Sequence, residues 1–267
     1  MTWTTRPRSD LPSGLCAIRA GNGSPCVLIH GVGLNADSWG AQIDAMSKHH
    51  AILAPDLPGH GDSPRLVGAV TLDTLTDCIA NAVAAFGMPV PVVGHSLGAL
   101  IAVNLAIRHP SLVSGVAALN AIHRRSPEAR DAVRARAAAM STDAPNDPAP
   151  TLARWFGDDL TRPQAIACRS WLTGVDPGGY KAAYTAFAEA RDFADADLAA
   201  ISCPALFLTG SEEPNSTPAM SRILAAAVPN GRAFVVEGAA HMAMMTHPNI
   251  VNAELDGFLK LVAGRLP

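Results

Sequence analysis

The 267-residue chain lacks the features that mark membrane proteins and nucleic-acid-binding proteins. It has no run of 18 apolar residues that could cross a bilayer, and its first residues lack the apolar stretch of a signal peptide. It also lacks any cluster of lysine or arginine, and its formal net charge is −3. Such a surface does not attract nucleic acid or anionic lipid. We therefore expect a cytoplasmic protein that binds neither nucleic acid nor membranes.

Cysteine is scarce as well, with five residues scattered along the chain. The number is odd, no CxxC pair occurs, and no histidine lies near a cysteine at the spacing of metal ligands. These thiols are expected to be reduced and mostly buried, without a structural metal. A cysteine nucleophile stays possible, although no cysteine stands where a strand turns into a helix.

The pattern that is present is an alternation of short apolar runs with helical patterns, which is typical of a parallel sheet covered by helices. We expect residues 1–119 and 203–267 to form one such α/β core. Helices are predicted to begin near Ser38, Leu72, Leu97, Pro218 and Pro248. The predicted strands are Leu15–Ala20, Cys26–His30, Ala51–Pro55, Val90–Val93, Val113–Leu119, Ala205–Thr209 and Arg232–Glu237.

The alternation stops between residues 120 and 202, where alanine- and arginine-rich helical patterns replace it. This segment is predicted to be a helical cap inserted between two strands of the sheet. A cap at the carboxyl edge of a sheet can cover a site located there.

The sequence Gly94-His95-Ser96-Leu97-Gly98 follows the apolar run Val90–Val93 directly and leads into a helical pattern. Glycine on both sides of a serine lets the backbone turn sharply between strand and helix, which exposes the hydroxyl at the sheet edge. The context of this motif therefore predicts that Ser96 is a nucleophile.

A serine nucleophile needs a histidine to accept its proton and an acid to orient that histidine. In folds with this turn, the expected chain order is serine, acid, histidine. Glu212 and Glu213 follow one predicted strand, and His241 lies in the loop after the next. We expect His241 to be the general base and one of the two glutamates to orient it.

The segment His30-Gly31-Val32-Gly33 follows another predicted strand. Its glycines allow the backbone to approach a ligand closely, and the amides of Val32 and Leu97 are predicted to form an oxyanion hole. His30 is expected mainly to support this loop, and a contact with substrate is the alternative.

These motifs together resemble those of the α/β-hydrolase fold superfamily along nearly the whole chain. The resemblance implies a mostly parallel central sheet flanked by helices with a helical cap, and chemistry without a cofactor or metal. It also implies a structural role for His60 and Asp62. The elements that carry it are His30–Gly33, Asp56–Ser63, Gly94–Gly98, Gly210–Pro218 and His241.

The acid departs from the pattern of the superfamily, which has aspartate three residues after the glycine that Gly210 matches. Glu213 occupies that position in this chain, so the resemblance favours it over Glu212. The additional methylene group moves the carboxylate by about one bond length, and the loop must adjust to it.

Serine at the turn favours acyl transfer through an acyl-enzyme. The cap is similar to that of 3-oxoadipate enol-lactonases around Arg154-Trp155-Phe156 and residues 176–182. This likeness implies a small ester or lactone, which can carry a free carboxylate that binds an arginine. Candidates for the cation are Arg124, Arg125 and Arg154, and candidates for other substrate contacts are His123, Trp155 and Met242.

Several alternatives share the same triad: a carboxylesterase or thioesterase, a carbon–carbon bond hydrolase and a cofactor-free perhydrolase. A ligand-binding protein on the same fold is an alternative of a different class. The sequence does not distinguish a monomer from a small homo-oligomer.

Overall fold

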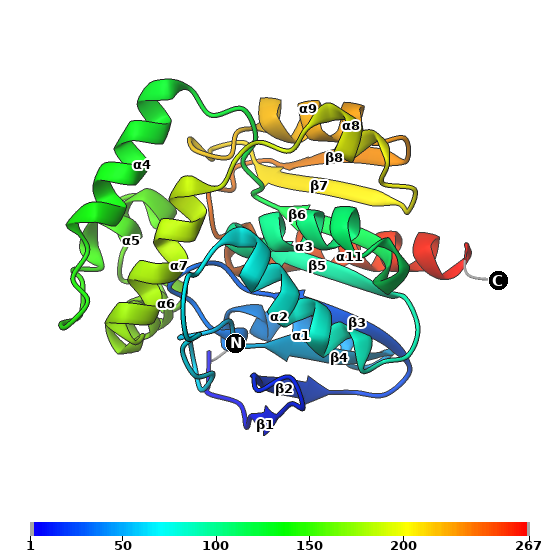
Figure 1. Cartoon of the computed structure of the whole chain (residues 1–267), viewed down its shortest axis with the longest axis horizontal. Coiled ribbons are helices and arrows are strands. Elements are labelled where there is room, and N and C mark those ends of the chain that lie inside the picture. The colour runs from blue at the N-terminus through cyan, green and yellow to red at the C-terminus, as the bar shows by residue number, and fades with distance from the viewer. Residues whose placement is uncertain (1–2, 266–267) are drawn as a thin grey trace.

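The computed structural model describes residues 3–265, which form an α/β fold around one sheet (Figure 1). The eight strands of these residues have the order β1-β2-β4-β3-β5-β6-β7-β8. Strands β3 to β8 are parallel, whereas β1 and β2 are antiparallel to their neighbours. The strands are β1 Ser9–Asp10, β2 Cys16–Ala20, β3 Ser24–Ile29, β4 His50–Pro55, β5 Val90–His95, β6 Val113–Leu119, β7 Ala205–Gly210 and β8 Gly231–Val236.

Helices cover both faces of the sheet, which explains why the parallel strands are apolar runs with little alternation (Figure 1). The α/β architecture expected from the sequence is confirmed, and the sheet adds one unexpected strand, the exposed two-residue β1. The helices of the core are η1 Ala36–Trp39, α1 Gly40–Met46, α2 Leu72–Ala84, α3 Leu97–Arg108, η2 Pro110–Leu112, α9 Pro218–Ala227, α10 Ala243–Thr246 and α11 Pro248–Ala263.

Five further helices lie between β6 and β7, in the segment 120–202 that we call the insertion. Helices α4 to α7 gather at one end of the sheet, on the left in Figure 1, whereas α8 contacts α9. The helices are α4 Pro127–Ala139, α5 Ala149–Phe156, α6 Pro163–Gly174, α7 Pro177–Glu189 and α8 Asp195–Ala199. Within residues 3–265, no helix is long and apolar enough to cross a membrane.

The turn between β5 and α3 depends on two glycines that leave no room for a side chain. A Cβ on Gly94 would lie 2.0 Å from the carbonyl oxygen of Gly98, and a Cβ on Gly98 would lie 2.2 Å from that of Ile29. The first turn of α3 therefore lies directly against β3 and β5. Ser96, at the apex, has a φ of +54°, which is unusual for a residue with a side chain.

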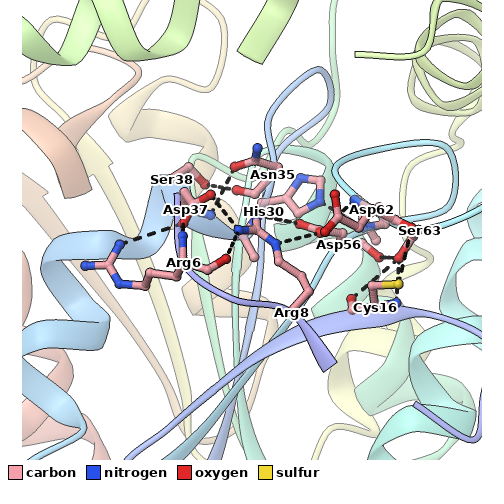
Figure 2. Close-up of polar contacts among 12 residues, drawn as sticks. Arg6, Arg8, Cys16, His30, Asn35, Asp37, Ser38, Asp56, Asp62 and Ser63 are labelled. Atoms are coloured by element: carbon pink, nitrogen blue, oxygen red, sulfur yellow. Dashed lines mark hydrogen bonds and ion pairs between the residues drawn. The ribbon is translucent and has the colours of Figure 1, made fainter. Parts of the chain in front are cut away.

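A buried ionic cluster fixes the N-terminal segment to the loops that follow β3 and β4 (Figure 2). The Arg8 guanidinium lies between two carboxylates, 2.7 Å from Asp37 and 3.1 Å from Asp56. The exposed fraction is 6% for the side chain of Arg8, 1% for Asp37 and 0% for Asp56. Asp56 also accepts the backbone N–H groups of Ala36 and Asp62. The cluster thus holds two loops that flank the end of β3.

We expect Arg8→Ala to lower the free energy of unfolding by about 3 kcal/mol, because it leaves buried Asp56 without its cation and leaves Asp37 with only Arg6, whose guanidinium is 3.8 Å away. Urea denaturation measures this change. Arg19→Ala is the control, since Arg19 lies exposed on β2. Equal effects of the two substitutions would contradict the importance of the cluster.

Candidate active site

One cavity of about 340 Å³ lies between the carboxyl ends of the strands and the insertion. We call it the inner cavity. Its lining includes three of the predicted site residues from the core, namely Val32, Ser96 and His241. The insertion contributes Trp155, the tyrosines 180 and 184, and three arginines, among other side chains. The structure therefore brings the predicted nucleophile and base to one enclosed place.

Glu213 lies directly behind His241. Its Oε2 is 2.7 Å from His241 Nδ1, and its Oε1 accepts the N–H groups of Asn215 and Ser216 at 2.7 and 3.2 Å. These contacts show how the loop adjusts to the longer side chain: the turn after Glu213 folds back and donates two backbone hydrogen bonds to its carboxylate. Glu212 is exposed and forms no such contact with His241.

The carboxyl group of Glu213 is only 2% exposed. Burial by itself raises the pKa of Glu213, but attraction to His241 and the hydrogen bonds from His241, Asn215 and Ser216 outweigh it and lower the pKa to about 2. The side chain is therefore an anion throughout the neutral range, as a group that orients a histidine must be.

His95, the variable residue before the serine, contacts the loop of His241 from another side. Its Nε2 lies 2.9 Å from the carbonyl oxygen of His241, and burial lowers its pKa to about 3. The neutral ring therefore donates a hydrogen bond to the backbone of the loop that carries His241. The motif pattern assigns no role to this position, so sequence reasoning missed it.

Asn120 was also missed. It follows β6 with a φ of +57° and is 2% exposed, and its amide nitrogen lies 3.4 Å from Glu213 Oε2. Asparagine tolerates this backbone conformation better than most residues. An asparagine at the end of a buried strand was the signal that could have identified it.

The two predicted oxyanion donors come from different segments of the chain, the start of α3 and the loop after β3. Leu97 is the first residue of α3, where an N–H has no partner within the helix. Val32 lies in the loop after β3, and a Cβ on neighbouring Gly31 would be 3.2 Å from the Cβ of Ser96. Among residues 3–265, neither N–H donates a hydrogen bond to another group of the chain.

His30 does not line the inner cavity, so the alternative of a substrate contact has no support from the lining. It is fully buried, its Nε2 accepts the N–H of Leu57, and its Nδ1 lies 2.7 Å from the carbonyl oxygen of Gly31. His60 plays a similar part, since its Nε2 accepts the N–H of Gly33. Burial lowers the pKa of both rings, and both support the loop that carries Val32.

Two further predicted contacts also lie outside the cavity lining. Met242 is fully buried in the hydrophobic core beside the base, and His123 is 1% exposed at the start of the insertion. Both residues are near the predicted site in sequence, but their side chains are buried. Trp155 does line the cavity, and its ring stacks on His241 at a centroid distance of 5.5 Å.

Three arginines line the inner cavity: Arg125 and Arg154, which were predicted, and Arg136, which was not. Within residues 3–265, none of them forms an ion pair with a carboxylate. Arg124 points elsewhere, because it pairs with Asp195 on the surface of the insertion. The helical pattern of α4 could not show which of its arginines faces the cavity.

Arg125 is the most buried of the three, with 7% of its surface exposed. Its Nη2 donates to the carbonyl oxygen of Phe187, and the guanidinium stacks on the Phe187 ring, whereas its buried Nη1 has no partner. Burial lowers the pKa of Arg125 to about 10, so the group remains a cation at neutral pH. Arg125 thus lines the same cavity as Ser96 and has one buried donor without a partner. No cluster of three or more His, Cys, Asp or Glu side chains suited to a metal occurs in residues 3–265.

Comparison with known proteins gives consistent matches over most of the chain. A family model described as alpha/beta hydrolase fold matches residues 25–248. The (E)-2-((N-methylformamido)methylene)succinate hydrolase of Acinetobacter baylyi is 38% identical over 243 residues, which are 90% of this chain and 92% of that protein.

Solved structures match over similar lengths. A thermophilic esterase from Thermogutta terrifontis has a TM-score of 0.84 and 25% identity, covering 97% of this chain and 99% of that one. The enol-lactonase from Burkholderia xenovorans has a TM-score of 0.80 and 27% identity, covering 95% of this chain and 100% of that one.

Acid should remove the stabilisation that ionised Glu213 provides. Its pKa is depressed from an ordinary value of about 4.3, so this contribution is complete above that value and is lost as the pH falls toward 2. Between pH 6 and pH 3, measured by urea denaturation, the wild type should lose more stability than Glu213→Gln. Glu212→Gln should follow the wild type. A wild type and Glu213→Gln that respond in parallel would refute the contacts described for Glu213.

Proposed function

The chain belongs to the alpha/beta hydrolase fold family, and on this basis we propose that it is a serine hydrolase that cleaves a small carboxylic ester or lactone through an acyl-enzyme. The observation that carries the proposal is the cavity that contains both Ser96 and His241, with Glu213 bound to the far side of the histidine.

In the first half of the reaction, His241 Nε2 takes the proton of the Ser96 hydroxyl while Oγ attacks the carbonyl carbon. Glu213 holds the proton of His241 on Nδ1, which leaves Nε2 free to act as a base. The negative charge that forms on the carbonyl oxygen is stabilised by the N–H groups of Val32 and Leu97. The alcohol or enol leaves with the proton from His241, and the acyl group stays on Ser96.

In the second half, His241 removes a proton from water, and the resulting hydroxide attacks the acyl-enzyme. The bond to Ser96 Oγ breaks, and Oγ recovers a proton from His241. The product is a carboxylic acid, which ionises at neutral pH. The insertion, acting as a lid, would exclude bulk water during these steps.

The arginines of the inner cavity support a substrate that carries a carboxylate of its own. A buried guanidinium with an unused donor forms a strong, directional hydrogen bond with such a group. The Acinetobacter relative is named for a substituted succinate, which is a dicarboxylate. Its name also favours a second candidate function, hydrolysis of the amide of an amidomethylene-substituted succinate by the same acyl transfer.

A fluorophosphonate probe tests the activated nucleophile. It should label the wild type rapidly and Ser96→Ala not at all. Labelling should be slower by a factor on the order of 10³ for Glu213→Ala, because the base is then misoriented. Glu212→Ala is the matched control and should react at the wild-type rate. A wild type that is not labelled would instead support a ligand-binding protein on the same fold.

Arg125→Gln should raise the KM for mono-p-nitrophenyl succinate by about tenfold or more, since a charged hydrogen bond contributes about 1.5–3 kcal/mol. The KM for neutral p-nitrophenyl acetate should change little. Steady-state kinetics with both esters measure the difference, and Arg124→Gln, which changes the neighbouring surface arginine, is the control. Equal losses on both esters would exclude a carboxylate contact at Arg125.

A further inference from the structure

A second cavity adjoins the inner cavity within the insertion. This outer chamber has a volume of about 200 Å³ and lies between α4, the segment before α5, α5 itself and α7. The two cavities share one wall, formed by Arg136, Thr151, Arg154, Tyr180 and Tyr184. These side chains therefore separate the inner cavity from the outer chamber.

The shared wall is cationic. Arg136 donates to the hydroxyl of Tyr184 at 2.8 Å, and Arg154 donates to the hydroxyl of Thr151 at 2.9 Å. Both partners are neutral, and no ion pair to a carboxylate is formed by either arginine within residues 3–265. Burial lowers the pKa of Arg154, and the nearby charge of Arg136 lowers it further. The two like charges thus repel each other without compensation from the chain.

One acidic residue also lines the outer chamber. Asp147 is exposed, and its carboxylate accepts the N–H of Ala149. It is not paired with Arg136 or Arg154, so the two guanidinium groups remain available to an anion.

We propose that the outer chamber is a second binding site for a small carboxylate, where Arg136 and Arg154 receive the acid product from the inner cavity. The inference rests on the proposed function, because hydrolysis of an ester creates one new carboxylate at each turnover. The site is separate from the contact proposed for Arg125, which lines only the inner cavity.

Product inhibition distinguishes one site from two. Hydrolysis of mono-p-nitrophenyl succinate is followed at several concentrations of added succinate. If succinate binds only in the inner cavity, it competes with substrate and the inhibition is purely competitive. If succinate also binds in the outer chamber while substrate occupies the inner cavity, it lowers the apparent kcat as well. We expect this mixed pattern for the wild type.

Ala139→Trp fills the outer chamber, because Ala139 is an exposed residue of α4 in its lining. In this variant, the inhibition constant of succinate for the decrease in apparent kcat should rise by about tenfold or more, equivalent to about 1.4 kcal/mol. The competitive component of the inhibition should remain. Ala135→Trp, exposed on the same helix and outside both linings, should behave as the wild type.

Two results would contradict a second binding site. One is purely competitive inhibition of the wild type by succinate, and the other is a decrease in apparent kcat that is as large in Ala139→Trp as in the wild type. Thermal unfolding verifies that the variant is folded, and Ala139→Leu replaces it if tryptophan prevents folding. Failure of the proposed function gives a different result, namely turnover that persists in Ser96→Ala.

Discussion

The close approach of α3 to the sheet at Gly94 and Gly98 is the constraint on which the site depends. With no side chain at either position, the first turn of the helix packs on the backbone of β3 and β5. Ser96 must then adopt a positive φ, Leu97 begins the helix with a free N–H, and His95 reaches the loop of His241. One packing contact therefore positions the proposed nucleophile, one oxyanion donor and a support of the base together.

The histidines around the site differ in role because they differ in surroundings. His30, His60 and His95 are enclosed in the core, and burial lowers the pKa of each, so that they act as neutral donors and acceptors to backbone groups. His241 instead lines the inner cavity with a carboxylate behind it. The same residue type thus serves as scaffold in three places and as the proposed base in one.

Much of this arrangement could be predicted from the sequence, because strand positions and turn chemistry are local signals. The apolar runs located the strands, and the glycines around Ser96 located the turn. The direction of side chains on the insertion could not be predicted in this way: Arg136 reaches the cavity, whereas Arg124 pairs on the surface. The burial of His123 could not be predicted either, because its place after a strand does not show how the neighbouring helices pack around its side chain.

The buried cluster of Arg8, Asp37 and Asp56 lies entirely within the first 63 residues of the chain together with the loops that it holds. During synthesis on the ribosome, the amino-terminal part of a chain emerges first. We expect the segment that carries Val32 to leave the ribosome together with Arg8, Asp37 and Asp56, well before His241 has been translated. The order of translation would then match the order of assembly, with the loop of Val32 organised first and the loop of His241 added last.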